Sequence, residues 1–470
     1  MTDDSALTAS IAAHRFGLGE ADLAGVGTDP RGWLEGQIGA ADAPAGSGLL
    51  SARQGLELIA AEREKRRRAA NPPPGLTAEQ VIGGHYRETL VADARSRLAT
   101  AAATRRPFAE RLFMFWANHF TVSLAKGSTR GLVGAFEREA IRPHIAGSFE
   151  DLLRASTTHP AMLRYLDNWL SAGPQSRIVG RLARRAARND ETPRLSGLNE
   201  NLAREVLELH TLGVESARLP RAGAAAARPA YGQADVTAFA RVLTGWRVAP
   251  QGDVDQRFDA DWHEPGRKSL LGKTYAEGAA ALDDVLHDLA LHPATARHLA
   301  TKLARHFVAD DPPPALVDQL DDAYRDSGGR LDAVYRALLR SPLAWGATAQ
   351  KLKTPQEWMV STLRLLGPDA AGSVRPDAAA ALGQRFHAAP SPAGWSDRAE
   401  DWLGPDAVWK RVEWATRLAE RAGRFVDARR LAERCLGARL SDTTRTQIER
   451  AADGPQALAL LLLAPEFQRR

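Results

Sequence analysis

The sequence has a single cysteine, Cys435, among its 470 residues. One thiol forms no internal disulfide and cannot build a cysteine-based zinc or iron–sulfur site. No run of 18 apolar residues occurs, so we expect no membrane span. The first residues, MTDDSALTAS, carry acids where a secretory signal needs lysine or arginine, which favours a cytoplasmic protein.

Short motifs of the common cofactor-binding and hydrolase families are also missing. The chain has no glycine-rich phosphate loop of the required spacing, no HExxH, no CxxC, and no GxSxG at a strand–helix turn. These absences leave NAD, ATP and the common hydrolase mechanisms without support.

The net charge of +5 is small for this length, and the positive excess is local. One basic run covers residues 63–68 and another covers residues 177–188. Neither is interleaved with aromatic residues at stacking spacing, so nucleic-acid binding is not expected. We interpret both runs as solvated, and we predict that residues 172–197 form a mobile, arginine-rich loop.

Helical periodicity dominates the chain, and convincing strand alternation is nearly absent. We predict an all-α fold, a large multi-helix bundle that forms a single domain over residues 1–470 and has one or two lobes. The predicted helices cover about 30–38, 50–70, 77–104, 108–120, 128–140, 149–157, 199–212, 233–244, 276–290, 294–308, 314–325, 330–340, 352–365, 376–385, 405–422, 425–435, 440–452 and 455–462. Long irregular loops are predicted at 40–48, 70–76, 171–197, 215–232, 247–274 and 386–404.

The segment LNENLAREVLELHTLGV, residues 198–214, carries many polar groups on one short amphipathic helix. Asn199 suits the N-cap, and Arg204 can form ion pairs one turn away in both directions. In a second interpretation, Asn201, Glu205 and Glu208 turn inward as ligands or acid–base groups.

A second polar group lies on an apolar helix face in FAERLFMFWANHFTVS. The spacing from Phe108 places His119 on the packed face beside Trp116. It is either a core histidine bonded to a backbone carbonyl or a ligand that points into the bundle. The neighbouring Asn118 could orient its ring.

Further candidates follow in YGQADVTAFARVLTGWR and in the turn-rich FDADWHEPGRKSLLGKTY. Asp235 is placed to cap a helix, whereas an inward Arg241 would need Glu205 or a bound anion. His263 and Lys268 stand in a loop where packing does not dictate them. One helix edge carries three basic residues, His298, Lys302 and His306, which are either solvated or bind an anion or substrate. For these residues, and for the four named before them, both a structural and a functional role stay possible.

These segments together resemble a large bacterial family catalogued as domain of unknown function 1800. The resemblance rests on HRFGLG, FWANHFTVS, HPAML, LNENLARE, QADVTAFARVLTGWR, the HEPG loop, HPATARHLATKLARHFVADDPP, KTPQEW and PSPAGWS, which occur in this order over nearly the whole chain. It implies a mostly helical single domain and no particular reaction. The chain departs from the family in Glu264, where members often have aspartate, and in lacking the export signal that many members carry.

Three hypotheses follow. In the first, the protein is a metal-dependent enzyme, with redox chemistry slightly favoured over hydrolysis. His119, Glu205 and His263 would bind a divalent metal such as iron, with Glu208 and Asp235 as reserve ligands. Arg241 would hold the carboxylate of a small-molecule or peptide substrate, and Lys268 would balance charge.

In the second hypothesis the protein is a non-catalytic binding or assembly protein, and Trp262, Trp395 and Trp402 line a groove for a peptide, glycan or lipid. In the third, the polar motifs are structural, with a buried Glu205–Arg241 ion pair and His119 as a hydrogen-bond partner.

The metal hypothesis predicts near-stoichiometric iron, manganese or zinc in the untagged protein. The His119→Ala variant should lose that metal, because one of three protein ligands is gone. Inductively coupled plasma mass spectrometry on both proteins measures it. Metal absent from both samples, after purification without chelators and attempted reconstitution, would count against the hypothesis.

Overall fold

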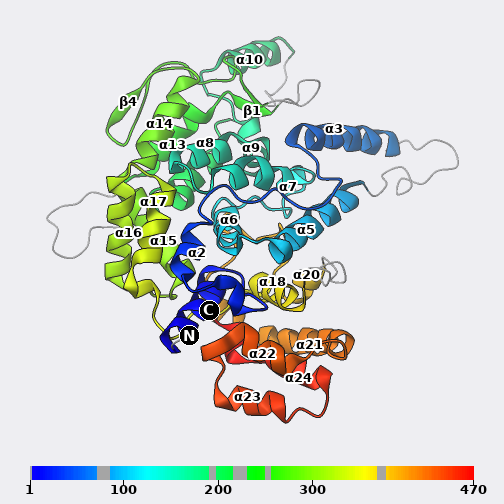
Figure 1. The fold of residues 1–470 in the computed structure, drawn as a ribbon. Helices are drawn as coiled ribbons and strands as arrows, with labels where there is room; N and C mark the ends of the chain where they lie inside the picture. Colours follow the sequence, from blue (N-terminus) through cyan, green and yellow to red (C-terminus); the bar gives the residue numbers. More distant parts are fainter. Residues whose placement is uncertain (1–2, 71–84, 190–196, 215–229, 249–255, 368–376) are drawn as a thin grey trace.

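The computed structural model describes residues 3–70, 85–189, 197–214, 230–248, 256–367 and 377–470. Helices make up most of this part of the chain (Figure 1), so the prediction of an all-α fold is confirmed. The predicted loop at 70–76 and most of the one at 215–232 lie outside the described residues.

The helices agree closely with the amphipathic segments of the sequence. Those of the first half are α1 (Asp3–Ile11), α2 (Pro30–Glu35), α3 (Ala52–Ala69), α5 (His85–Ala103), α6 (Pro107–His119), α7 (Val133–Phe136), α8 (Phe149–Thr158), α9 (Pro160–Tyr165), α10 (Arg177–Asn189), α11 (Asn201–Glu205) and α13 (Gln233–Leu243). Those of the second half are α14 (Ala280–Ala290), α15 (Pro293–Phe307), α16 (Pro314–Asp326), α17 (Leu331–Arg340), α18 (Pro355–Leu366), α20 (Ala378–Ala381), α21 (Pro405–Ala422), α22 (Ala428–Leu436), α23 (Asp442–Glu449), α24 (Gly454–Leu463) and α25 (Pro465–Gln468). Three π-helical turns, Ala12–Phe16, Glu137–Ile141 and Val206–His210, extend α1, α7 and α11.

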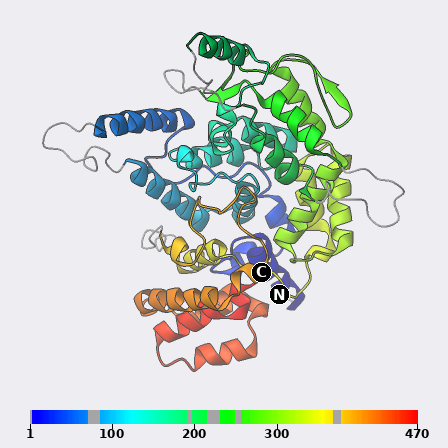
Figure 2. The same cartoon turned by 180° about the vertical axis from the view of Figure 1, so that it is seen from behind.

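Buried apolar side chains form two clusters. The larger one joins most helices from α1 to α17, and the smaller one joins part of α5 to α18 and the C-terminal helices. In Figure 1 the helices α21 to α24 form a layer below α18 and α20. Figure 2, seen from behind, shows the two ends of the described chain beside each other above this layer.

The segment predicted as an irregular loop at 247–274 contains two small hairpins. The strands β1 (Trp246–Val248) and β2 (Gln256–Phe258) pair antiparallel, with Trp246 opposite Phe258. The strands β3 (Lys268–Leu270) and β4 (Lys273–Tyr275) pair in the same way. Strands of three residues are too short to show the alternation by which a sequence reveals a strand.

The prediction of a loop over residues 172–197 is wrong for α10, which is helical over Arg177–Asn189. Arg181 pairs with Asp261 at 2.6 Å, and the backbone nitrogen of Ile178 donates to the carbonyl oxygen of the same aspartate at 2.9 Å. Arg181 of this basic run thus has an acidic partner 80 residues further along the chain, although most residues of α10 are exposed.

A buried hydrogen-bond chain connects α6 to α17 in the larger cluster. The indole nitrogen of Trp116 donates to the hydroxyl of Tyr335 at 2.6 Å, and that hydroxyl donates to the carbonyl oxygen of Ile145 at 2.5 Å. Both side chains are fully buried, so neither polar group has water as an alternative partner.

We expect Tyr335→Phe to lower the free energy of unfolding by about 1–3 kcal/mol, because it leaves one buried donor and one buried acceptor unpaired. Tyr324→Phe is the matched control, since its hydroxyl makes one bond, to the carbonyl oxygen of Ala290. Urea unfolding of the three proteins should rank Tyr335→Phe as the least stable. Equal losses in the two variants would contradict this role for Tyr335.

Candidate functional site

The polar side chains of segment 198–214 bond mainly to one another and to α13. Asn199 accepts a hydrogen bond from the backbone nitrogen of Asn201 at 2.9 Å, but the N-cap position of α11 is Glu200 and not the predicted Asn199. Arg204 pairs with Glu200 at 3.3 Å and with Glu208 at 3.5 Å. Glu200 also accepts bonds from α13, which ties the two helices together. The ion-pair interpretation therefore accounts for Glu208, and Asn201 is exposed rather than turned inward.

Glu205 and Arg241 do not form the predicted buried ion pair within the described part of the chain. Arg241 is exposed on α13, whereas Glu205 is half-buried on α11. Burial, with the nearby Glu208, raises the pKa of Glu205. Nothing therefore places Arg241 to hold a substrate carboxylate against Glu205.

His263 has partners for both ring nitrogens. Its Nδ1 donates to the carbonyl oxygen of Thr244 at 2.7 Å, and its Nε2 accepts from Nζ of Lys268 at 2.8 Å. Lys268 also donates to the carbonyl oxygen of Glu264. Both residues thus fix the hairpin loop, and no lone pair of His263 is left for a metal ion.

Asp235 caps α13, as its position predicted. One carboxylate oxygen accepts from the backbone nitrogen of Gly232 at 2.9 Å, and the other accepts from that of Leu271 at 2.7 Å. Leu271 has a left-handed φ of 52° at the tip of the β3–β4 hairpin, so Asp235 also holds this turn.

His119 is a buried core histidine, and Asn118 does not orient it. Its Nε2 donates to the carbonyl oxygen of His210 at 3.1 Å, and its ring lies 6.0 Å from that of His210 and 6.2 Å from that of His298. Burial, reinforced by Lys302, keeps the pKa of His119 well below its usual range. On the basic edge of α15, His306 is buried and His298 and Lys302 are half-buried, so this edge is not a fully solvated face.

Among the residues that the structure describes, no group of three or more His, Cys, Asp or Glu side chains is arranged to hold a metal ion. His119, Glu205 and His263 therefore do not come together as the predicted ligand set, and the two histidines are bonded in different places, to His210 and to Thr244 and Lys268.

The three tryptophans proposed for a groove have different partners. Trp262 packs under the guanidinium of Arg247, 3.3 Å from its ring centre. Trp395 and Trp402 lie together, with ring centres 5.9 Å apart. Trp395 also lines a cavity.

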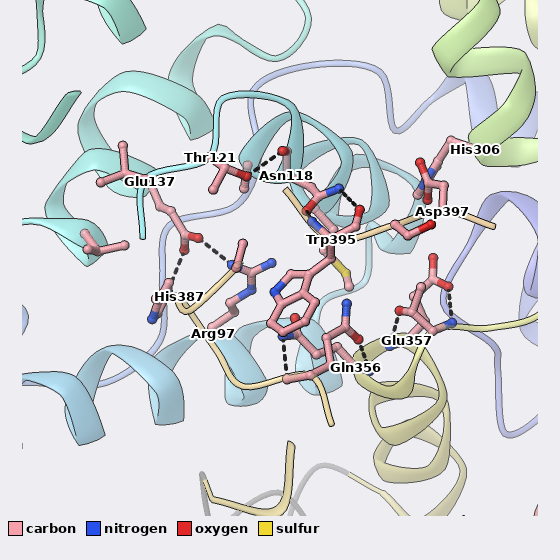
Figure 3. A pocket seen from close by; sticks show the side chains of 18 of the residues that line it. Arg97, Asn118, Thr121, Glu137, His306, Gln356, Glu357, His387, Trp395 and Asp397 are labelled. Carbon is pink, nitrogen blue, oxygen red and sulfur yellow. Dashed lines mark hydrogen bonds and ion pairs between the residues drawn. The ribbon is translucent and has the colours of Figure 1, made fainter. Parts of the chain in front are cut away.

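Figure 3 shows this cavity. One of its lining residues, Met114, packs against both apolar clusters. Its walls come from α5, α6, the turn after α7, the end of α15, the start of α18 and the segment 384–397. The space between its atoms, including the open mouth, is about 700 Å³. The centre of a water-sized sphere can reach only about 60 Å³ of that space. The cavity thus admits water or a small group unless a wall moves.

One wall carries an imidazole–carboxylate pair. His306, near the end of α15, lies with Nδ1 3.0 Å from Oδ1 of Asp397. A carboxylate accepts only, so Nδ1 carries the proton, and the buried Nε2 has no hydrogen-bond partner. Burial lowers the pKa of His306 although Asp397 raises it, which leaves the ring neutral and Nε2 able to accept a proton.

Figure 3 shows a second imidazole–carboxylate pair across the cavity, on the far side of Trp395. One oxygen of Glu137 binds Arg97, and the other lies 3.2 Å from Nε2 of His387. Burial acts against ionisation here, but Arg97 and His387 outweigh it and lower the pKa of Glu137 to about 2. His387 has a left-handed φ of 54°, a conformation that costs a non-glycine residue energy and that clusters at functional sites.

Asn118 holds the segment that carries Trp395. Its Nδ2 donates to the carbonyl oxygen of Trp395 at 2.8 Å, and its Oδ1 accepts from the backbone nitrogen at 2.7 Å. The preceding Gly394 has a φ of +83°, and a Cβ there would come within 2.4 Å of the carbonyl oxygen of Asn118. Asn118 thus lines the cavity together with two other residues singled out in the sequence, His306 and Trp395.

Sequence reasoning missed Arg97, Glu137, His387 and Asp397. Two motifs did point to this place: Thr354 and Glu357 form a capping box after Lys353, and PSPAGWS ends one residue before Asp397. Neither motif shows from the sequence which side chains it would face.

The model of one protein family, described as Protein of unknown function (DUF1800), matches residues 11–469. No curated protein and no solved structure matches the chain. No helix of the described residues is long and apolar enough to cross a membrane.

The buried histidines predict that acid destabilises the fold. Burial lowers the pKa of His210 to about 3 and that of His298 to about 4. An unfolded histidine titrates near 6.5, so the unfolded chain binds more protons and the free energy of unfolding falls from pH 6.5 towards 3. We expect His210→Phe to remove on the order of 3 kcal/mol of this loss, as measured by urea unfolding across that range.

His287→Phe is the control for this experiment, because His287 is exposed and pairs with Glu150 on the surface. It should keep the acid loss of the unchanged protein. An equally steep loss in His210→Phe would show that His210 is not a source of it.

Proposed function

We propose that this chain, which belongs to the DUF1800 family, is an enzyme that uses acid–base chemistry on a small polar molecule in the cavity around Trp395. The observation that carries the proposal is the pair of His306 and Asp397, in which one imidazole nitrogen is held by a carboxylate and the other has no partner. A neutral imidazole so oriented is the usual form of a general base.

His306 would take a proton from a bound water or from a substrate hydroxyl. Its Nε2 accepts no hydrogen bond from a serine, threonine or cysteine of the described chain, so a protein nucleophile is not supported. Asp397 is ionised, because His306 and nearby cations lower its pKa against the effect of burial. It would stabilise the imidazolium that forms when His306 takes the proton.

The opposite wall supplies hydrogen-bonding groups for the substrate. Arg97 and His387 already share the carboxylate of Glu137, which fixes their positions on one side of the cavity. Gln356 and Gln384 bond to each other's backbone at the base of the cavity, and they also line it. A small polar molecule fits these groups better than an extended apolar one.

Trp395 decides the size of the ligand. Its indole crosses the cavity in Figure 3 and is only half-buried, so its movement would open the space below. This arrangement supports a small molecule as the substrate and gives less support to the long groove for a peptide, glycan or lipid.

Metal-dependent chemistry stays a prediction. A histidine whose Nδ1 bonds a carboxylate also resembles a metal ligand with its supporting partner. The lack of a third His, Cys, Asp or Glu within ligand distance, among the described residues, favours proton transfer over metal binding at His306.

Asp397→Asn should lower kcat/KM by about 10²–10⁴, the usual contribution of an oriented general base. His306→Gln should lose as much, because both variants remove the same function. A panel of chromogenic esters, amides, glycosides and phosphoesters provides the screen, and kcat/KM on the best substrate provides the measurement.

His287→Gln is the matched control, since it breaks a histidine–carboxylate pair of similar length, 2.8 Å, on the surface. It should retain full activity. Equal activity in Asp397→Asn and the unchanged protein, both folded, would sink the proposal.

A further inference from the structure

Arg470 contacts two residues that line the cavity, His306 and Glu357. Its side chain is almost fully buried. Its Nη2 lies 3.0 Å from Oε1 of Glu357, and its Nε donates to Oε2 of the same carboxylate at 3.3 Å. Its Nη1 donates to the carbonyl oxygen of His306. One guanidinium thus contacts both the backbone of the proposed base and a carboxylate that lines the cavity.

Backbone hydrogen bonds to residues 351–353 fix the segment that carries Arg470. The nitrogen of Arg470 donates to the carbonyl oxygen of Lys351 at 2.8 Å, and the nitrogen of Lys351 donates back at 3.2 Å. The nitrogen of Lys353 donates to the carbonyl oxygen of Gln468 at 2.9 Å. Residues 351–353 lead straight into α18, so this pairing fixes the turn that brings Glu357 to the cavity.

We infer that Arg470 is a positioning residue of the proposed site, which fixes His306 through its carbonyl oxygen and, together with Glu357, sets how readily His306 accepts a proton. The inference rests on the proposed function of His306. It extends that function to a residue outside the cavity lining, 164 positions away in the sequence.

Arg470 and Glu357 affect the pKa of His306 in opposite directions. Burial is the main cause that lowers the pKa of His306, and Asp397 opposes it. Beyond these, Arg470 lowers the pKa and Glu357 raises it. Other cations around this region are Lys302 and Arg305 on α15, Arg111 on α6, Arg15 after α1, Lys351 before α18 and Arg411 on α21.

The test is an imidazole ¹⁵N NMR titration of the full chain with labelled histidine, in which His306 is assigned by its absence in His306→Gln. Arg470→Met should move the titration midpoint of His306 to higher pH, because a positive charge is lost. Glu357→Gln should move it to lower pH, because a negative charge is lost. A role in packing alone would predict no such opposition of sign.

Two further variants control the experiment. Arg470→Lys keeps the charge and should leave the midpoint close to that of the unchanged protein. Arg164→Met removes another buried arginine, which bonds the carbonyl oxygen of Ser128 and stacks on Trp169, and should leave it unchanged. If Arg470→Met does not fold, Arg470→Gln, which removes the same charge but keeps a hydrogen-bonding side chain, takes its place in the comparison.

Midpoints that move in the same direction in Arg470→Met and Glu357→Gln, or that do not move in folded variants, would overturn the inference. The titration needs no substrate, so its outcome is separate from that of the activity screen. The His306 midpoint could move in opposite directions in Arg470→Met and Glu357→Gln while Asp397→Asn keeps full activity. That result would support the effect of Arg470 and Glu357 on His306 and reject the proposed reaction.

Discussion

The arrangement of the cavity depends on the sharing of one buried carboxylate, Glu357, by two arginines. Arg111 binds it at 2.5 Å from α6, and Arg470 binds it from the end of the described chain. A buried ion costs several kcal/mol unless opposite charges and hydrogen bonds compensate for it. The two guanidinium groups lower the pKa of Glu357 to about 2 against the effect of burial. These two ion pairs thereby connect α6, α18 and the segment that ends at Arg470.

The other parts of the site are attached to these three segments. The end of α6 carries Asn118, whose amide holds the backbone of Trp395. The residue after Trp395 and Ser396 is Asp397, which orients His306. The position of the proposed base therefore follows from a chain of contacts that begins at Glu357, and not from the helix α15 alone.

The sequence predicts the helices well because apolar periodicity is a local property. Even α15 and α18 start within a few residues of the predicted bounds. The prediction failed for α10, because the arginines between Ile178, Leu182 and Ala186 outweighed the apolar spacing. One of them, Arg181, has its acidic partner, Asp261, 80 positions away in the sequence. Local charge alone does not reveal whether a distant partner exists.

The site was harder to predict for the same reason. His306 and Asp397 are 91 positions apart, and Glu137 and His387 are 250 positions apart, so no spacing rule connects them. The segment 198–214 attracted interest because its polar residues are neighbours in sequence. Neighbouring charges on one helix pair most easily with each other, which is what Glu200, Arg204 and Glu208 do.

The pair of Arg97 and Glu137 has a consequence for selection in the laboratory. Well-packed apolar residues in place of a buried ion pair often leave a protein as stable or make it more stable. A library selected only for survival at high temperature would therefore accumulate apolar side chains at both positions together, because replacing one partner alone leaves a buried charge unpaired. The same would hold for glycine at position 387, where the left-handed backbone costs histidine energy. The positions that change in heat-resistant variants would thus be those whose present residues do not stabilise the fold.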